Sequence, residues 1–290
     1  MKYCQGPDAK TKIPNFAVPP KACDAHCHVF GPANQFPFFP GRTYTPPDAS
    51  YDSMQVLQKI LGIERAVIVQ ATCHGTDNSA ALDAIKRSKG RYRGVAIVDE
   101  GFSDHDFMKL HEGGIRGVRF SFARHIGNAP DFRTVRKIGN RIASLGWHIV
   151  IYMEALDIVE YSKTLADLPL PVVIDHMGRV KTKHGIGQEP FQLLLNLLRE
   201  KEDFWVKICG AERISSQGPP FQDAIPFAQA CIAAAPGRVL WGTDWPHPNI
   251  EGYMPNDGDL LDLLASHAPD EKTRHKILVD NPARLYGFND

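Results

Sequence analysis

Short apolar, β-branched segments recur along the chain and alternate with segments of helical periodicity. The apolar segments are residues 22–30, 65–72, 93–99, 114–122, 148–154, 171–178, 204–210 and 238–245. Amphipathic helical patterns lie between them, for example at residues 78–90, 132–146, 191–201 and 223–235. Apolar strands that alternate with amphipathic helices are typical of a parallel sheet covered on both faces. Eight such strands predict an α/β fold, a closed (β/α)8 TIM barrel.

An open, doubly wound sheet is the alternative fold for the same alternating pattern. That fold usually carries a glycine-rich phosphate-binding turn after its first strand, and none follows residues 22–30. The chain shows no linker, internal repeat or low-complexity tract, and one barrel commonly reaches this length. We therefore expect one domain, a TIM barrel over residues 21–290 with closing helices after Asp244, preceded by an N-terminal arm at residues 1–20.

Charge and cysteine content exclude several classes of protein. The chain has 33 basic and 33 acidic residues and a net charge of zero, which argues against binding to nucleic acid or to a membrane surface. No apolar run is long enough to span a bilayer, and residues 1–20 lack the apolar core of a secretory signal. Six cysteines without paired spacing predict reduced thiols and a cytoplasmic location. The pattern leaves the oligomeric state open.

Histidine and aspartate residues stand at the carboxyl ends of three predicted strands: His26 and His28, then His176, then Asp244. In a closed barrel these ends meet at one mouth, where the first and eighth strands are neighbours. The two-residue spacing places His26 and His28 on the same face of their strand. One strand-end histidine is more often a structural residue, but four reactive side chains at one mouth indicate a catalytic or metal site.

The same four residues are candidate ligands for one zinc ion with an open position for water. A second, bridging ion is not expected, because the fourth predicted strand ends in Arg119 and Ser121 and offers no lysine or glutamate.

The mouth also carries side chains suited to an anionic substrate. Arginine binds both oxygens of a carboxylate or sulfonate at once, although for Arg179 and Arg213 a surface ion pair is the simpler alternative. The candidate substrate contacts in or near the predicted strands are Thr72, His74, Arg119, Arg124, Tyr152, Arg179 and Arg213.

Several motifs resemble the amidohydrolase superfamily. DAHCH at residues 24–28 and TDWPHPN at residues 243–249 resemble the superfamily broadly. VFGP at residues 29–32, QATCHGTDN at residues 70–78 and HEGGIRGVRF at residues 111–120 resemble its branch of 2-pyrone-4,6-dicarboxylate lactonases. This resemblance implies a TIM barrel and hydrolytic opening of an acidic, unsaturated cyclic ester.

The resemblance also implies which residues act. It implies substrate contacts at Tyr44 and Asn249. After the fourth strand the branch carries Lys-Arg where this chain has Arg124 and His125, so that contact passes to His125 or to Arg124. This departure bears on the substrate and leaves the reaction class unchanged.

A mechanism follows from the four strand-end residues. Asp244 acts as general base on water, while His26, His28 and His176 polarise the lactone carbonyl directly or through zinc. The resemblance implies metal-free hydrolysis for pyrone lactonases and zinc for their sulfolactone relatives, so we expect no metal or one zinc ion. The expected substrate is 2-pyrone-4,6-dicarboxylate, from bacterial degradation of aromatic compounds. The alternatives are 4-sulfomuconolactone hydrolysis, a sugar lactonase, a metal-dependent decarboxylase of the superfamily and a non-catalytic ligand-binding barrel.

Overall fold

Eight parallel strands surround a common interior in the computed structural model, which describes residues 2–127 and 129–288. Each strand pairs with the next along the chain, in an unbroken parallel order. The strands are β2 (Cys23–Cys27), β4 (Arg65–Val69), β5 (Tyr92–Ala96), β6 (Ile115–Ser121), β7 (His148–Tyr152), β8 (Val172–Ile174), β9 (Phe204–Lys207) and β10 (Val239–Leu240).

Backbone hydrogen bonds close the seam between the first and last strands of this sheet. The amide of Ala25 donates to the carbonyl of Trp241 (2.9 Å), and the amide of Asp244 donates to the carbonyl of His26 (2.7 Å). The predicted TIM barrel is thereby confirmed. The strands are shorter than the apolar segments that predicted them, so His28, His176 and Asp244 lie in the turns that follow.

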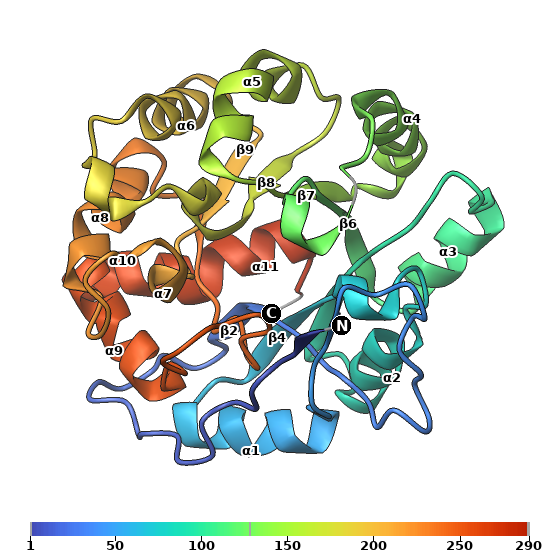
Figure 1. Ribbon diagram of the computed structural model, residues 1–290, viewed down its shortest axis with the longest axis horizontal. Coiled ribbons are helices and arrows are strands. Elements are labelled where there is room, and N and C mark those ends of the chain that lie inside the picture. The colour runs from blue at the N-terminus through green and yellow to red at the C-terminus, as the bar shows by residue number, and fades with distance from the viewer. Residues whose placement is uncertain (1, 128, 289–290) are drawn as a thin grey trace.

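Helices form a ring outside the strands (Figure 1). Their apolar faces pack against the strands, as the amphipathic patterns predicted, and residues such as Ile138 and Leu194 are buried there. The helices of the ring are α1 (Tyr51–Leu61), α2 (Ser79–Arg87), α3 (Asp104–Glu112), α4 (Phe132–Ile142), α5 (Ala155–Ala166), α6 (Glu189–Glu200), α8 (Ile225–Ala234) and α9 (Asp257–His267). The short helix α7 (Ala211–Ile214) lies inside the ring, in the turn after β9, and packs on the turn at Asp175–Arg179 (Figure 1). None of the helices in the described part of the chain is long and apolar enough to cross a membrane.

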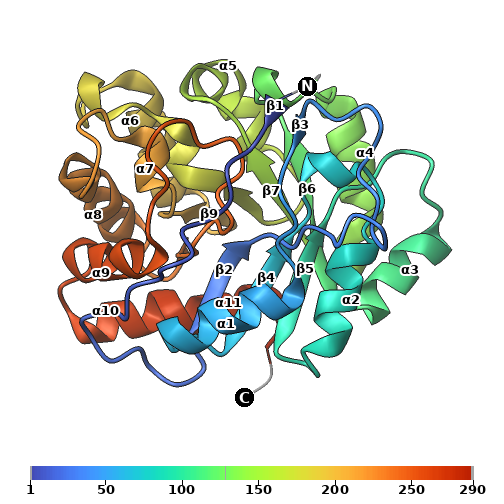
Figure 2. The same ribbon diagram turned by 60° about the horizontal axis from the view of Figure 1, so that its bottom comes forward.

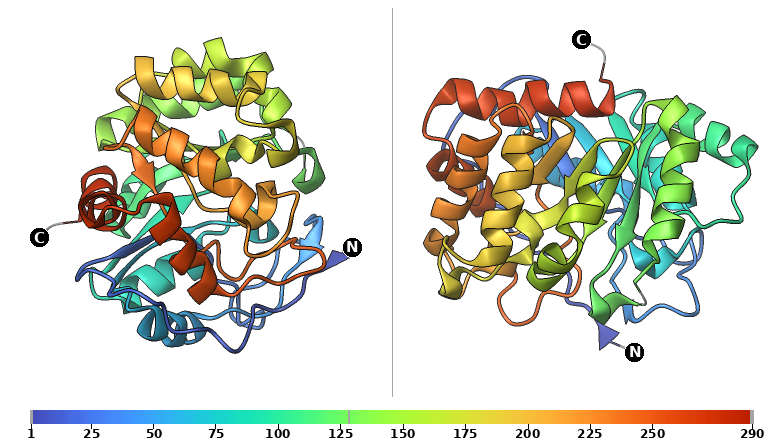
Figure 3. Two further views of the ribbon diagram at one scale, coloured as in Figure 1. Left: turned by 90° about the vertical axis from the view of Figure 1, so that its left-hand side faces the viewer. Right: turned by 90° about the horizontal axis from the view of Figure 1, so that it is seen from above.

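The C-terminal segment covers one end of the barrel. It consists of α10 (Glu271–His275), a π-helical turn at 276–280 and α11 (Asn281–Tyr286), and the π-helical turn and α11 contact β2 and β10. Tyr286 and Phe288 belong to the same buried cluster as the inward-facing valines of the strands. The two termini lie at opposite ends of the barrel (Figures 2 and 3). One end is therefore plugged, and the chemistry must lie at the other.

The first residues of the chain cross the open end. Lys2–Tyr3 form β1, which pairs in parallel with β3 (Tyr44–Thr45). Further along the arm, Lys12 makes ion pairs with Asp259 (2.8 Å) and Asp262 (2.7 Å) of α9. The sequence pattern did not predict this small sheet, because each of its strands has only two residues.

Candidate active site

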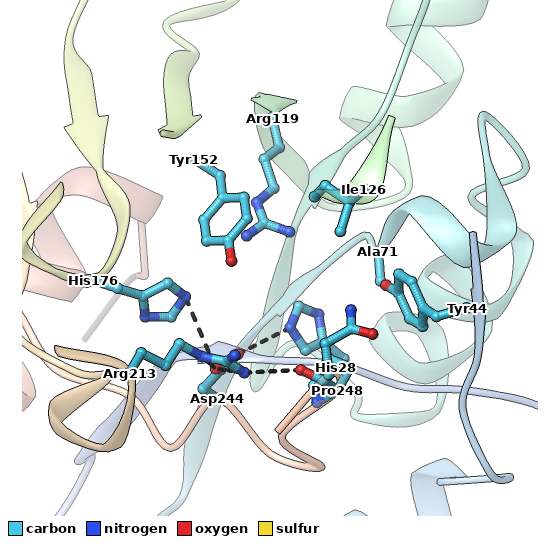
Figure 4. Close-up of a pocket in the computed structure, with 11 residues that line it drawn as sticks. His28, Tyr44, Ala71, Arg119, Ile126, Tyr152, His176, Arg213, Asp244 and Pro248 are labelled. Atoms are coloured by element: carbon cyan, nitrogen blue, oxygen red, sulfur yellow. Dashed lines mark hydrogen bonds and ion pairs between the residues drawn. The ribbon is translucent and has the colours of Figure 1, made fainter. Parts of the chain in front are cut away.

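A narrow pocket of about 30 Å³ opens at the carboxyl ends of the barrel strands. In Figure 4 the Tyr152 hydroxyl and the Arg119 guanidinium point into the space opposite His176, His28 and Asp244. The lining residues are His28, Tyr44, Ala71, Arg119, Ile126, Tyr152, His176, Arg213, Asp244, Pro248 and Asn249.

The four predicted reactive residues meet at the floor of this pocket. Oδ1 of Asp244 lies 3.2 Å from Nε2 of His28 and 3.4 Å from Nε2 of His26. Oδ2 of Asp244 lies 3.9 Å from Nε2 of His176. All four side chains are almost completely buried. The three histidines thus surround one carboxylate.

Unusual backbone conformations aim two of these side chains. His176 has φ of 49° and Asp244 has φ of 64°, which are left-handed conformations that side-chain-bearing residues adopt rarely. Gly210 makes room beside His176, since a Cβ there would lie 2.8 Å from Nδ1 of the histidine. Such strain costs about 1–3 kcal/mol per residue and is concentrated at functional sites.

Arg213 holds the other side of the Asp244 carboxylate. Its Nε and Nη2 atoms lie 2.6 Å and 2.5 Å from Oδ2, and Nη2 also donates to the carbonyl of Pro248 (3.1 Å). Burial acts to raise the pKa of Asp244, but Arg213, His176, His28 and His26 together hold this pKa well below its usual value. Asp244 is therefore ionised at neutral pH, with Oδ1 facing the histidines.

Burial makes two of the histidines neutral. It lowers the pKa of His26 well below its ordinary value and lowers the pKa of His176 to about 3. A neutral imidazole has one N–H donor and one acceptor nitrogen. Nδ1 of His28 donates to the carbonyl of Val69 (2.7 Å), because a carbonyl oxygen can only accept.

A buried ion network that the sequence analysis missed lies beneath the pocket. Nζ of Lys207 lies 3.1 Å from Oδ1 of Asp175 and 2.9 Å from Nδ1 of His26. Arg119 binds the other oxygen of Asp175 through Nε (3.0 Å) and Nη2 (2.9 Å). Burial acts to raise the pKa of Asp175, but Lys207, His26 and Arg119 hold it well below its usual value. The available signal was a lysine in the apolar strand segment FWVK, because fully buried lysines are rare unless they are paired.

A second group that the sequence analysis missed lies behind Arg213. The Glu212 side chain is 2% exposed, and its Oε1 lies 3.6 Å from Nε of Arg213 and 4.0 Å from Nδ1 of His247. Nε2 of His247 contacts Asp257 (3.1 Å). Burial raises the pKa of Glu212. These groups back the guanidinium of Arg213 and do not line the pocket.

Tyr152 stands between two predicted arginines at the pocket wall. Its ring centroid lies 4.7 Å from the guanidinium carbon of Arg119 and 5.3 Å from that of Arg179. Nη1 of Arg179 donates to the tyrosine hydroxyl (2.5 Å). The same arginine and Nδ1 of His125 approach Oε1 of Glu154, at 3.7 Å and 3.5 Å. Arg179 and His125 thus belong to the rim.

The remaining predicted contacts divide between the pocket and its surroundings. Arg124 and His125 line a separate hollow outside the pocket, beside α5. Thr72 and His74 lie in a short turn after β4 and do not line the pocket. His74 packs on Phe38, with ring centroids 4.9 Å apart, and its Nδ1 faces the carbonyl of Pro37 (3.2 Å). The turn directs the His74 side chain away, places Thr72 beside Tyr44 and leaves Ala71 at the pocket wall.

The pocket floor is also the place where a metal ion would bind. Donor atoms of His26, His176 and Asp244 all lie within 4.8 Å of one another. His28 adds a fourth nitrogen beside the same carboxylate. These residues therefore have the types and the proximity that a mononuclear zinc site needs.

Comparisons with known proteins agree with this architecture. A family model described as amidohydrolase matches residues 23–288. A 2-pyrone-4,6-dicarboxylate hydrolase from Comamonas testosteroni is 47% identical over 286 residues, which cover 96% of this chain and 94% of that protein. A 4-sulfomuconolactone hydrolase from Rhizobium radiobacter is 42% identical, covering 98% of this chain and 96% of that protein.

A solved structure is similar as well. It is described as a probable 2-pyrone-4,6-dicarboxylic acid hydrolase from Acinetobacter baumannii with citric acid bound. It superposes with a TM-score of 0.80 at 28% identity, covering 92% of this chain and 100% of that chain. Together with the family model, these similarities confirm the resemblance found in the sequence motifs: the chain belongs to the amidohydrolase family.

Proposed function

We propose that the protein is a lactonase that hydrolyses the ring ester of 2-pyrone-4,6-dicarboxylate during the breakdown of aromatic compounds. The observation that carries the proposal is the ionised Asp244 carboxylate, which faces three histidines at the floor of an arginine-lined pocket. The similarity to lactone hydrolases over almost the whole chain supports the same reaction class.

In the proposed reaction, Oδ1 of Asp244 removes a proton from a water molecule, whose oxygen attacks the lactone carbonyl. His26 and His176, whose Nε2 atoms face Asp244, stabilise the oxyanion of the tetrahedral intermediate through their N–H groups, while Nδ1 of His28 donates to the carbonyl of Val69. When the intermediate collapses, the ring C–O bond breaks, and its electrons remain on the ring oxygen as an enolate. The proton that Asp244 removed from the water passes to this enolate, which completes the ring opening and regenerates the carboxylate. Arg213 leaves Oδ1 available for the water because both of its contacts are to Oδ2.

The substrate's carboxylates provide the binding energy that positions the ring. Arg119 and Arg213 present guanidinium groups to the pocket, and Tyr44, Tyr152 and Asn249 add hydrogen-bonding side chains. Arg179 and His125 at the rim, together with Arg124 in the hollow outside the pocket, attract the anion as it approaches. Two anchored carboxylates hold the carbonyl carbon beside the water, which lowers the entropic part of the barrier.

We further propose that the reaction needs no metal ion. Two cations already lie beside the residues that zinc would use: Arg213 contacts Asp244 (2.5 Å) and Lys207 contacts Nδ1 of His26 (2.9 Å). A divalent ion would add charge beside both. The donor set therefore does not fit zinc in this state, although its spacing does. A conjugated lactone carbonyl is reactive enough for hydrogen-bond donors to polarise it.

Hydrolysis of 4-sulfomuconolactone is the second candidate function. The Rhizobium radiobacter relative with that activity in its name is nearly as similar as the pyrone hydrolase. A sulfonate would also suit the arginines of the pocket. We place either reaction in the cytoplasm, in keeping with six cysteines that all have free thiols.

The deciding experiment offers the purified protein both lactones side by side, before and after treatment with a chelator. We expect loss of the conjugated pyrone absorbance, release of one proton and no carbon dioxide, with unchanged rates after chelation. Faster turnover of the sulfolactone would reverse the substrate assignment, and carbon dioxide release would indicate a decarboxylase. Binding without turnover of any lactone would leave only a ligand-binding barrel.

A further inference from the structure

Lys207 is a fully buried lysine whose ammonium group touches a residue of the reacting centre. Its side chain is 0% exposed, as is that of Asp175, its partner at 3.1 Å. Nζ also lies 2.9 Å from Nδ1 of His26. Burying a charged lysine inside a barrel has a large desolvation cost, which its ion pair with Asp175 offsets only in part. The contact with His26 is the feature that the ion pair alone does not explain.

Two groups compete for Nδ1 of His26. Lys207 lies at 2.9 Å and Oδ1 of Asp175 lies at 3.3 Å. An ammonium group has three donors and no acceptor, whereas a carboxylate is only an acceptor. If Nδ1 receives a hydrogen bond from Lys207, the proton of a neutral imidazole must be on Nε2. If Asp175 were the dominant partner, the proton would be on Nδ1 and Nε2 would carry a lone pair.

We propose that Lys207 is a positioning residue that selects the Nε2–H tautomer of His26 and thereby makes this histidine a hydrogen-bond donor to the reacting centre. Nε2 of His26 is buried, lies 3.4 Å from Oδ1 of Asp244 and has no hydrogen-bond partner among the described residues. A proton on this atom is attracted by the carboxylate and is available to an oxyanion. In the other tautomer, a lone pair on Nε2 would face the lone pairs of the Asp244 carboxylate, which is unfavourable, and Nε2 could then bind a metal ion.

Burial and packing hold the His26 ring in one orientation beside Lys207. The His26 side chain is fully buried, and its ring packs against those of His28 and His176, with ring centroids 5.1 Å and 4.7 Å away. The ring therefore has little freedom to exchange its two nitrogens by flipping. Under these conditions the tautomer is set by the partner at Nδ1, as is usual for functional histidines. The tautomer does not depend on the proposed substrate; only its kinetic consequence rests on the proposed function.

The test measures the tautomer directly by nitrogen-15 NMR of histidine-labelled protein, with His26→Gln used to assign the signal. We expect Nε2–H in the wild type and Nδ1–H in Lys207→Met, because Asp175 then becomes the only strong partner at Nδ1. In the double variant Lys207→Met/Asp175→Asn, the new carboxamide can donate to Nδ1, and we expect Nε2–H to return. A purely structural lysine would not produce this recovery.

Kinetics provide the second measurement. Loss of one oxyanion donor lowers turnover roughly 100-fold or more, so we expect that fall in kcat for Lys207→Met, with a smaller change in KM, and partial recovery in the double variant. Nδ1–H in the wild type, or Nε2–H retained in Lys207→Met, would overturn the proposal. If the wild type turned over no lactone, the proposed function would fail while the NMR result still decided the role of Lys207.

Discussion

At the floor of the pocket, Oδ1 of Asp244 faces His26 and His28, while Arg213 holds Oδ2. Oδ1, the proposed base, is therefore separate from Oδ2, which binds the Arg213 counter-ion. The pKa of Asp244 lies well below the usual range, since the charges of Arg213 and the histidines outweigh burial. Asp244 therefore stays ionised through the neutral range, as the proposed role of general base requires.

Replacement of Asp244 by asparagine tests the general base. Asp244→Asn keeps the shape of the side chain but removes the charge and the basic oxygen, so we expect kcat to fall roughly 1,000-fold or more. Binding of the lactone, measured by calorimetry, should change little. Asp104→Asn is a matched control, because Asp104 is 89% exposed on α3. Near-normal turnover in Asp244→Asn would require another base.

Replacement of Arg119 by methionine tests substrate anchoring. Arg119 lines the pocket and binds Asp175, so Arg119→Met removes a cation that would bind the carboxylate. We expect KM to rise roughly tenfold or more, with kcat within a few-fold of the wild-type value. Arg116→Met is the control, since Arg116 lies on the same strand but bonds the carbonyl of His111. A change in kcat alone would argue against anchoring.

At the scale of secondary structure, the site depends on the turns after the strands. The period-two pattern predicted that His26 and His28 share a face, and both approach the same oxygen of Asp244. The pattern could not show that the chain leaves β4 in a turn that carries His74 away from the pocket. Turn geometry depends on packing with the neighbouring loop, which apolar periodicity does not encode.

A substitution at Gly210 tests whether the turns after the strands position the site. In Gly210→Ala the new Cβ would meet His176, and the φ of 84° is unfavourable for alanine. We expect a loss of about 1–2 kcal/mol in the free energy of unfolding from the backbone alone, together with a fall in kcat of roughly tenfold or more from displacement of the histidine.

Gly146→Ala is the matched control for Gly210→Ala. Gly146 has φ of 67°, and a Cβ added there would meet nothing within 4 Å. This variant should show a similar loss of stability in urea unfolding with unchanged kcat. Equal kcat values for the two variants would mean that close packing on His176 does not position the ring.

At the scale of the whole molecule, the barrel buries several histidines in their neutral form. Burial lowers the pKa of His148 and His176 to about 3 and that of His267 to about 4. Both ring nitrogens of His267, on α9, lack a hydrogen-bond partner among the described residues. In the unfolded chain these residues have the ordinary histidine pKa. At pH values between the lowered pKa of the folded state and this ordinary pKa, the unfolded state therefore binds more protons than the folded state.

The stability of the protein should therefore fall as the pH is lowered through this window. For His267 the contribution is complete above the ordinary histidine pKa and is lost as the pH falls toward about 4. Each such histidine contributes up to about 1.4 kcal/mol per pH unit. Urea unfolding of the wild type and His267→Gln between about pH 7 and about pH 5 checks this. The variant should show the shallower dependence, and equal slopes would contradict the neutral, buried state of His267.

The sequence alone predicted the barrel and its family, both of which are confirmed, and it singled out the candidate reactive residues, because apolar periodicity and short motifs are local properties of the chain. It placed His26, His28, His176 and Asp244 at strand ends, and the closed sheet brings these ends together. The roles of Lys207 and Arg213 were decided only by the tertiary structure. Lys207 meets His26 across 181 residues of chain, and Arg213 meets Asp244 across 31. Hydrogen-bond partners and desolvation at such contacts exist only after folding, and they set the charge and tautomer of each reactive group.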